Sequence, residues 1–221
     1  MNKKSFLTAS TLALAISTAT TAVYSAELEE IIVTAQKRAE SLQDVPISMS
    51  ALSGSTIKDN GIHSFQDLSG YVPNLEIAEN AVNTIITMRG IGIGSNQSFE
   101  QSVGIYVDGV HFGKSRQVRS GLFDVEQVEV LRGPQGILFG KNTLAGAINV
   151  TTASANVGDE FSGGIDVSQE SYNGQIVDAH IAGSVTDNLA LRFAIRDRTR
   201  DGHIKNTMPG ASTDTMATTD E

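Results

Sequence analysis

The residues of this sequence that could carry out chemistry are few and scattered. The four histidines are His63, His111, His180 and His203, and no two have the spacing of paired metal ligands. The chain has no cysteine, which excludes a thiolate metal site, a disulfide scaffold and a cysteine nucleophile. We therefore expect the histidines to be surface or turn residues. We also expect no enzyme activity, no metal and no cofactor.

Two further groups of residues invite a functional interpretation. The glycine-rich run Gly90-Ile91-Gly92-Ile93-Gly94 lacks the GxGxxG spacing and the following helix of a dinucleotide site. It is either a ligand-contacting loop, which we extend to Gln101, or a flexible loop without a ligand role. Asp124, Glu126 and Glu129 lie in a strand-like run, and we expect them to form its solvated face.

Composition narrows the possible partners. The formal net charge is -9, whereas binding to nucleic acid needs a basic surface. Twenty-one glycines and an aromatic content of 5% favour short strands and turns over long packed helices.

The N-terminus has the pattern of an export signal. Lys3 and Lys4 precede a mildly apolar stretch, residues 6–22, which small residues follow. We predict a signal peptide over residues 1–26, and cleavage after Ala22 or Ser25 fits the pattern. The alternative is an amphipathic N-terminal helix of a cytoplasmic protein. The stretch is too short and too hydroxylated for a membrane-spanning helix.

Next comes a short strand-forming run, Ile31-Ile32-Val33-Thr34-Ala35, which charged residues flank on both sides. Its β-branched side chains favour an extended backbone. The run is either the first strand of the folded domain or a tether that adds to the sheet edge of another protein. We assign residues 27–43 to this segment and its linker.

The segment 44–153 has the pattern of one small α+β domain. Strands are expected near residues 47–52, 83–89, 103–107, 110–112, 125–131 and 147–152, with short helices at 55–60 and from Ser64 to near Gly70. Asp108-Gly109 predicts a tight hairpin because both residues tolerate positive φ. Gly133–Gly136 predicts a turn.

Alternation of apolar and polar residues dominates from residue 154 onwards. Three runs, 161–168, 177–185 and 189–196, each have one apolar face, and tight turns at 171–174 and 186–188 separate them. An ordinary antiparallel sheet with one wet face would show the same alternation. The dyad pattern favours transmembrane barrel strands, with Arg192, Arg196, Arg198 and Arg200 facing a watery lumen.

Ordered motifs then identify a family resemblance. The run from Leu131 to Val150, LRGPQGILFGKNTLAGAINV, strongly resembles the end of the plug domain of TonB-dependent receptors. Four shorter matches precede it in the order of that family: Val45-Pro46-Ile47-Ser48, Pro73-Asn74-Leu75, Met88-Arg89-Gly90-Ile91-Gly92 and Val107-Asp108-Gly109-Val110. The resemblance covers essentially the whole chain after the signal.

The resemblance implies an α+β plug domain, followed by the first antiparallel strands of a barrel with about 22 strands. It implies that Ile31, Ile32, Val33, Thr34 and Ala35 are a TonB box, which pairs with TonB and its inner-membrane energising complex. Arg89 and Arg132 would pair with barrel-wall carboxylates, or they are solvated loop charges. Gly92, Gly94, Ser95, Asn96 and Gln97 would form the apical loop that faces the ligand.

The function that the resemblance implies is energy-coupled uptake of a scarce ligand, such as a ferric siderophore, in the outer membrane. Residues 154–221 supply about three strands, so we expect a truncated, plug-containing part of such a receptor. The alternative is a stand-alone periplasmic binding module that binds ligand or TonB without transport.

Overall fold

The protein is represented by a computed structural model, which describes residues 31–34, 37–80, 83–94, 100–119, 121–202, 204–205, 215–216 and 219–220. The predicted signal peptide, residues 1–26, lies outside the described residues. The described residues all fall within one structural unit, 31–221. The boundaries that we drew at residues 43 and 153 stay predictions.

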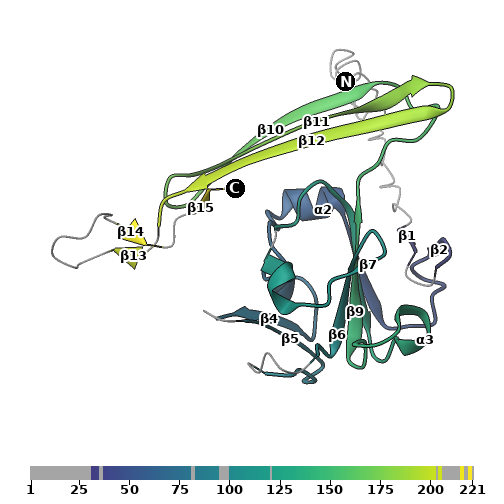
Figure 1. The fold of residues 1–221 in the computed structure, drawn as a ribbon, viewed down its shortest axis with the longest axis vertical. Coiled ribbons are helices and arrows are strands. Elements are labelled where there is room, and N and C mark those ends of the chain that lie inside the picture. The colour runs from purple at the N-terminus through teal and green to yellow at the C-terminus, as the bar shows by residue number, and fades with distance from the viewer. Residues whose placement is uncertain are drawn as a thin grey trace, which may run out of the picture. The chain divides into compact units, whose positions relative to one another are not determined.

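A mixed five-stranded sheet forms the centre of the α+β domain (Figure 1). Its order is β3-β8-β9-β6-β7, with β3 at Met49–Ser53, β8 at Val125–Arg132, β9 at Gly146–Thr152, β6 at Val103–Val107 and β7 at Val110–His111. Only β6 and β9 run parallel, and the other neighbours are antiparallel. Because β8 lies between β3 and β9, its main chain is hydrogen-bonded on both sides.

The predicted Asp108-Gly109 hairpin is confirmed. Both residues have positive φ, 48° and 77°, and they join β6 to β7. Positive φ at both central positions twists the turn in the same sense as the strands that it connects. The Asp108 carboxylate also accepts the main-chain N–H of Thr152 at 2.9 Å, which fastens the hairpin to the end of β9.

Two predicted helices on the domain form as short pieces. Helix α2 spans Gly54–Asp59, its N-cap Ser53 accepts the main-chain N–H of Thr56, and Gly61 follows it with φ 62°. The predicted capping residues Ser64 and Asp67 exchange side-chain and main-chain hydrogen bonds and open a 3-10 helix, η1, at Asp67–Gly70. A further 3-10 helix, η2, spans Ser115–Arg119.

Neither η2 nor one further helix was predicted. Helix α3, Gly136–Phe139, begins where the sequence indicated only a turn. The hairpin of β4, Leu75–Glu79, and β5, Thr84–Met88, makes a separate two-stranded sheet. The core lies between these pieces and the five-stranded sheet. It is formed by Ile57, Ile62, Phe65, Leu68, Val72, Leu75, Ile77, Ile86, Met88, Val103, Ile105, Val118, Leu122, Val128, Val130, Ala145, Ile148 and Val150.

The three predicted alternating runs are confirmed as long antiparallel strands, which lie side by side in Figure 1. They are β10, Ser162–Glu170, β11, Gly174–Thr186, and β12, Leu189–Arg200. We call these three strands the ladder. One of its faces exposes large apolar side chains: Ile165, Val167, Ile181, Leu191, Phe193 and Ile195.

Three further strands after the ladder are two-residue pieces: β13, Ile204–Lys205, β14, Thr215–Met216, and β15, Thr219–Asp220. Strand β13 pairs with β14, and β15 pairs with the end of β12. Among the described residues, none of the helices is long and apolar enough to cross a membrane.

Candidate functional site: the docked N-terminal strand and the polar seam

The strand-forming run at the N-terminus is not a free tether in this structure. Ile32–Val33 form β1, which pairs with β2, Glu40–Ser41, in a small antiparallel hairpin. Lys37, with φ 64°, donates its main-chain N–H to the Thr34 carbonyl at 2.8 Å and closes the turn. Ala35 lies outside the described residues. We call residues 31–34 the N-terminal strand.

The two sides of this strand have different surroundings. The Val33 side chain is 1% exposed, whereas Ile32 is 46% exposed. Polar side chains of β8 contact the main chain of the strand: Gln127 Nε2 donates to the Ile32 carbonyl at 3.1 Å, and Glu129 accepts the main-chain N–H of Thr34. The strand therefore lies against β8 through one buried valine and through side-chain contacts to its backbone.

The expectation that Glu129 is solvated was wrong. Glu129 is 1% exposed, and both of its carboxylate oxygens accept hydrogen bonds from neutral donors. The sequence run around it, Val128 to Val130, suggests one wet face. In the structure both faces of β8 are covered, one by the core and the other by the N-terminal strand. Glu126 alone of the three acidic residues is exposed.

The glycine-rich segment is only partly described. Gly92 approaches Thr87 so closely that a Cβ would lie 2.5 Å from its Oγ1, and Gly94 has φ 64°. Ser95, Asn96 and Gln97 lie outside the described residues. Gln101, just beyond them, is 7% exposed, and its side-chain amide has no hydrogen-bond partner among the residues that the structure describes. The ligand-facing role of this segment stays a prediction.

Arg89 and Arg132 lie near each other, and each contacts the domain itself. Arg132 donates to the Pro73 and Met49 carbonyls at 3.3 and 3.0 Å, and its pKa is lowered by burial and by the charge of Arg89. Arg89 has φ 52° and donates its main-chain N–H to the Asn74 carbonyl. Within the described residues, neither guanidinium lies within ion-pair distance of a carboxylate, so the predicted pairing is untested.

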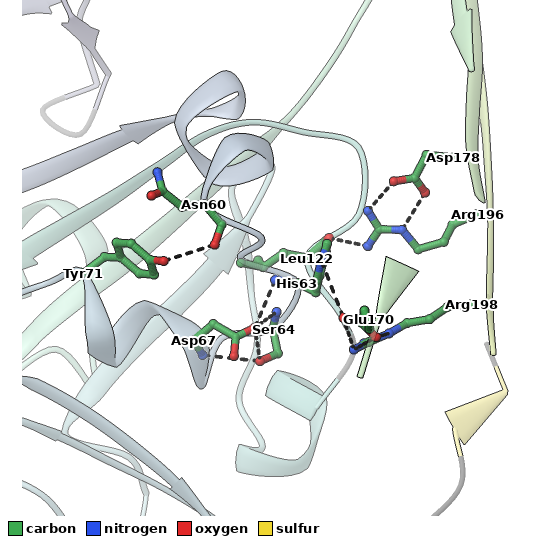
Figure 2. A network of polar contacts seen from close by, with 10 residues as sticks. All are labelled: Asn60, His63, Ser64, Asp67, Tyr71, Leu122, Glu170, Asp178, Arg196 and Arg198. Atoms are coloured by element: carbon green, nitrogen blue, oxygen red, sulfur yellow. Dashed lines mark hydrogen bonds and ion pairs between the residues drawn. The ribbon is translucent and has the colours of Figure 1, made fainter. Parts of the chain in front are cut away.

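Charged contacts do join the α+β domain to the ladder, but they involve other residues. Arg192 of β12 binds Asp124 through two hydrogen bonds, Nε–Oδ2 at 2.7 Å and Nη2–Oδ1 at 2.6 Å. Arg196 binds Asp178 of β11 in the same two-pronged manner and also donates to the Leu122 carbonyl (Figure 2). We call these contacts, with those of His63 below, the polar seam. Asp124 is therefore a paired residue, not a solvated one.

His63 lies at the same seam. Its Nε2 is 3.7 Å from Oε1 of Glu170, which also binds Arg198 (Figure 2). Burial lowers the pKa of His63 below its ordinary value of 6.5. The charges of Arg196 and Arg198 act in the same sense, and Glu170 and Asp67 oppose them. The histidine is thus half-buried in an interface. Apart from Asp67, the charged groups around it are distant along the chain, so a reading of the sequence alone does not reveal this position.

The contacts of the polar seam are suited to holding two parts of the protein together. A bidentate arginine–carboxylate pair fixes both position and orientation, and it is stronger than a pair of neutral hydrogen bonds. Three of the four arginines that we expected to face a watery lumen, Arg192, Arg196 and Arg198, instead hold carboxylates, and Arg196 also holds a carbonyl. The arrangement can dock one domain against a strand face, and it offers no nucleophile aligned with a base.

Comparisons with known proteins agree with these features. The family model described as "TonB-dependent Receptor Plug Domain" matches residues 41–147. The pesticin receptor of Yersinia pestis is 32% identical over 167 residues, which is 71% of this chain and 24% of that receptor. The iron-regulated outer membrane virulence protein of Vibrio cholerae is 27% identical over 192 residues, or 78% of this chain and 28% of the relative.

A solved structure gives the same result. The crystal structure of the ferric yersiniabactin uptake receptor FyuA from Yersinia pestis superposes with a TM-score of 0.68 at 29% identity, covering 78% of this chain and 27% of that one. This chain spans about a quarter of the length of the curated relatives that it matches. Its plug motifs, its mixed sheet and the ladder that follows show that the chain belongs to the TonB-dependent receptor family.

Proposed function

We propose that this chain is the plug-bearing part of a receptor that takes up a scarce ligand across the outer membrane with energy delivered by TonB. The family is one of outer-membrane receptors, and the chain is an outer-membrane protein. The observation that carries the proposal is the N-terminal strand. It is extended, it precedes the plug, and it belongs to a small hairpin that rests on β8 through Val33 and side-chain contacts.

Residues 31–35 are the TonB box in this proposal. An extended segment with an exposed side, such as Ile32, can add to the sheet edge of a partner through main-chain hydrogen bonds. The partner is TonB with its inner-membrane energising complex. Force on the box would pass to β8, which the N-terminal strand contacts, and from there into the plug.

The ligand class that we propose is a ferric siderophore. Two of the relatives support it, a ferric yersiniabactin uptake receptor and an iron-regulated outer membrane protein. The contact surface that we propose is the apical segment 92–97. Its Gly94, with positive φ, lets the chain turn where a side chain would be strained.

Substitution of Ile32 by proline tests the TonB box. Proline removes a main-chain donor and is confined to edge or terminal positions of strands. We expect Ile32→Pro to abolish crosslinking between the box and TonB and to abolish uptake of iron-loaded siderophore by cells. Ile32→Ala keeps the main-chain N–H and should retain crosslinking. Crosslinking of Ile32→Pro at the level of the parent would refute the assignment.

A further inference from the structure

Glu129 has surroundings that its role in the sheet does not explain. It is a carboxylate at 1% exposure, and no cation lies within ion-pair distance of it among the described residues. Oε2 accepts from Asn149 Nδ2 at 2.9 Å, and Asn149 is its direct cross-strand neighbour on β9. Oε1 accepts from the main-chain N–H and the hydroxyl of Thr34.

The donors of Glu129 differ in kind. Asn149 belongs to the central sheet, whereas Thr34 is 95 residues away along the chain and follows the strand of a small separate hairpin. A buried carboxylate needs its hydrogen bonds, because an unsatisfied buried charge is costly. Glu129 is therefore best satisfied when the N-terminal strand lies on β8.

The contacts to the strand follow the two-residue period of β8. Gln127 and Glu129 project from the same face and contact the backbone at Ile32 and Thr34, one through a donor and the other through an acceptor. The main chain of β8 is already paired with β3 and β9, so it cannot take a further strand. The two side chains supply the main-chain partners that a free sheet edge would otherwise provide.

We propose that Glu129, assisted by Gln127, is a docking site for the N-terminal strand, and that it sets how often this strand is available to a partner. The description of the strand as a TonB box rests on the function proposed above. The main-chain N–H of Thr34 that binds Glu129 is also a donor that strand addition would use, so docking and partner binding compete. Glu129 is thus a positioning residue.

Thiol labelling tests this docking, because the chain contains no cysteine. Val33→Cys and Ile32→Cys are placed separately into the protein in outer-membrane vesicles, and the labelling rate of each is measured without TonB. Ile32→Cys should react fast, because position 32 is exposed, and Val33→Cys should react at least about tenfold more slowly. Glu129→Gln keeps the shape but removes the charge, and it should raise the rate at position 33 about tenfold or more.

Two controls separate docking from general stability. Glu126→Gln makes the same chemical change on the same strand at an exposed position and should leave the rate at position 33 unchanged. Val130→Cys is fully buried in the core and should stay protected in the Glu129→Gln background. An increase at position 130 equal to that at position 33 would show that Glu129 merely supports the fold, and the proposal would then be wrong.

A variant on the strand side of the contact keeps the test informative if Glu129→Gln fails to fold. Thr34→Pro deletes the N–H that Glu129 accepts and leaves β8 untouched. It should release position 33 to the same extent, and combining it with Glu129→Gln should add nothing further. Equal rates at position 33 in the parent, in Glu129→Gln and in Thr34→Pro would overturn the docking site.

The labelling assay measures docking of the N-terminal strand whether or not its partner is TonB. If docking behaves as described but the strand never crosslinks to TonB, only the identity of the partner fails. If the docking site and the TonB box are both correct, Glu129→Gln should raise ligand-independent crosslinking at position 32 several-fold. Crosslinking that Glu129→Gln leaves unchanged, with position 33 released, would contradict the competition between docking and partner binding.

Discussion

At the scale of single residues, the structure shows that two acidic side chains expected to be solvated are instead paired. Asp124 and Glu129 stand five positions apart in the same region, yet one holds an arginine of the ladder and the other holds a backbone N–H of the N-terminal strand. The sequence predicts both to be solvated, because a short charged run with alternating valines resembles the outer face of a strand. Only the tertiary partners of a carboxylate decide whether it is paired.

His63 provides a prediction at the same scale. Its pKa is lowered in the folded protein, first by burial and then by two arginines. Well above pH 6.5 the imidazole is neutral in both the folded and the unfolded chain. As the pH falls below 6.5, the unfolded chain takes up the proton first, so the free energy of unfolding decreases until the pH lies below the folded pKa. Acidification should therefore weaken the plug.

The effect can be measured through the labelling of Val130→Cys with a pyridyl disulfide, which reacts at acid pH. The ratio of the labelling rates with His63 and with His63→Gln cancels the intrinsic reactivity of the thiol. We expect this ratio to rise between pH 7.5 and 5.5, because only the parent loses stability through the histidine. A ratio that falls with acidification would mean that Glu170 and Asp67, rather than burial, dominate the pKa.

At the scale of elements, local signals predicted most of the plug. The Asp108-Gly109 turn, the Ser53 and Ser64 caps and the strand alternation each depend on neighbouring residues, and each has the expected structure. Helix α3 was missed because its four residues are too few to show a period. The hairpin of β1 and β2 was missed because it depends on contacts with β8 that lie far away in the sequence.

Close approach between elements gives the next prediction. Gly146 begins β9 at a point where a Cβ would lie 2.2 Å from the Met88 sulfur and 2.3 Å from the Leu131 carbonyl oxygen. Gly146→Ala must push β5 away from β8 and β9, and we expect it to lower the free energy of unfolding by roughly 2–3 kcal/mol. The measurement is protection of Val130→Cys in increasing denaturant.

Gly136 offers the matched control. A Cβ at this position in α3 meets nothing within 4 Å, and alanine favours a helix. Gly136→Ala should leave the protection unchanged or slightly increased. If both substitutions had the same effect, the tight packing at Gly146 could not be the reason for the loss.

At the scale of the whole molecule, the proposed function would act through two of the contacts of the plug, the polar seam and the docked N-terminal strand. The polar seam fastens the segment 122–124 to β12, and the N-terminal strand rests on β8, which begins at Val125. The point at which the partner would pull is thus close in sequence to the point at which the ladder holds. A pull on the N-terminal strand would load β8 against a fixed end, which favours local opening over release of the plug as a rigid body.

If the polar seam is a fixed end for β8, its contacts must add to the free energy of unfolding. Asp124 and Arg192 are about four-fifths buried at the side chain, so their two hydrogen bonds are shielded from solvent. A double-mutant cycle with Asp124→Asn and Arg192→Gln should give a coupling free energy of about 1–3 kcal/mol. The readout is again the protection of Val130→Cys in outer-membrane vesicles.

The ion pair of Lys141 and Glu100 is the control for the seam. Its side chains are 73% and 62% exposed, so solvent screens their charges. A cycle with Lys141→Gln and Glu100→Gln should give a coupling of less than about 1 kcal/mol. Similar coupling in the two cycles would mean that the seam is no more than a surface contact. Asp124 would then not be a fixed point of the plug, and a pull on the N-terminal strand would not load β8 against it. A clearly larger coupling free energy for Asp124 and Arg192 than for Lys141 and Glu100 would identify residues 122–124 as the fixed end against which β8 is loaded.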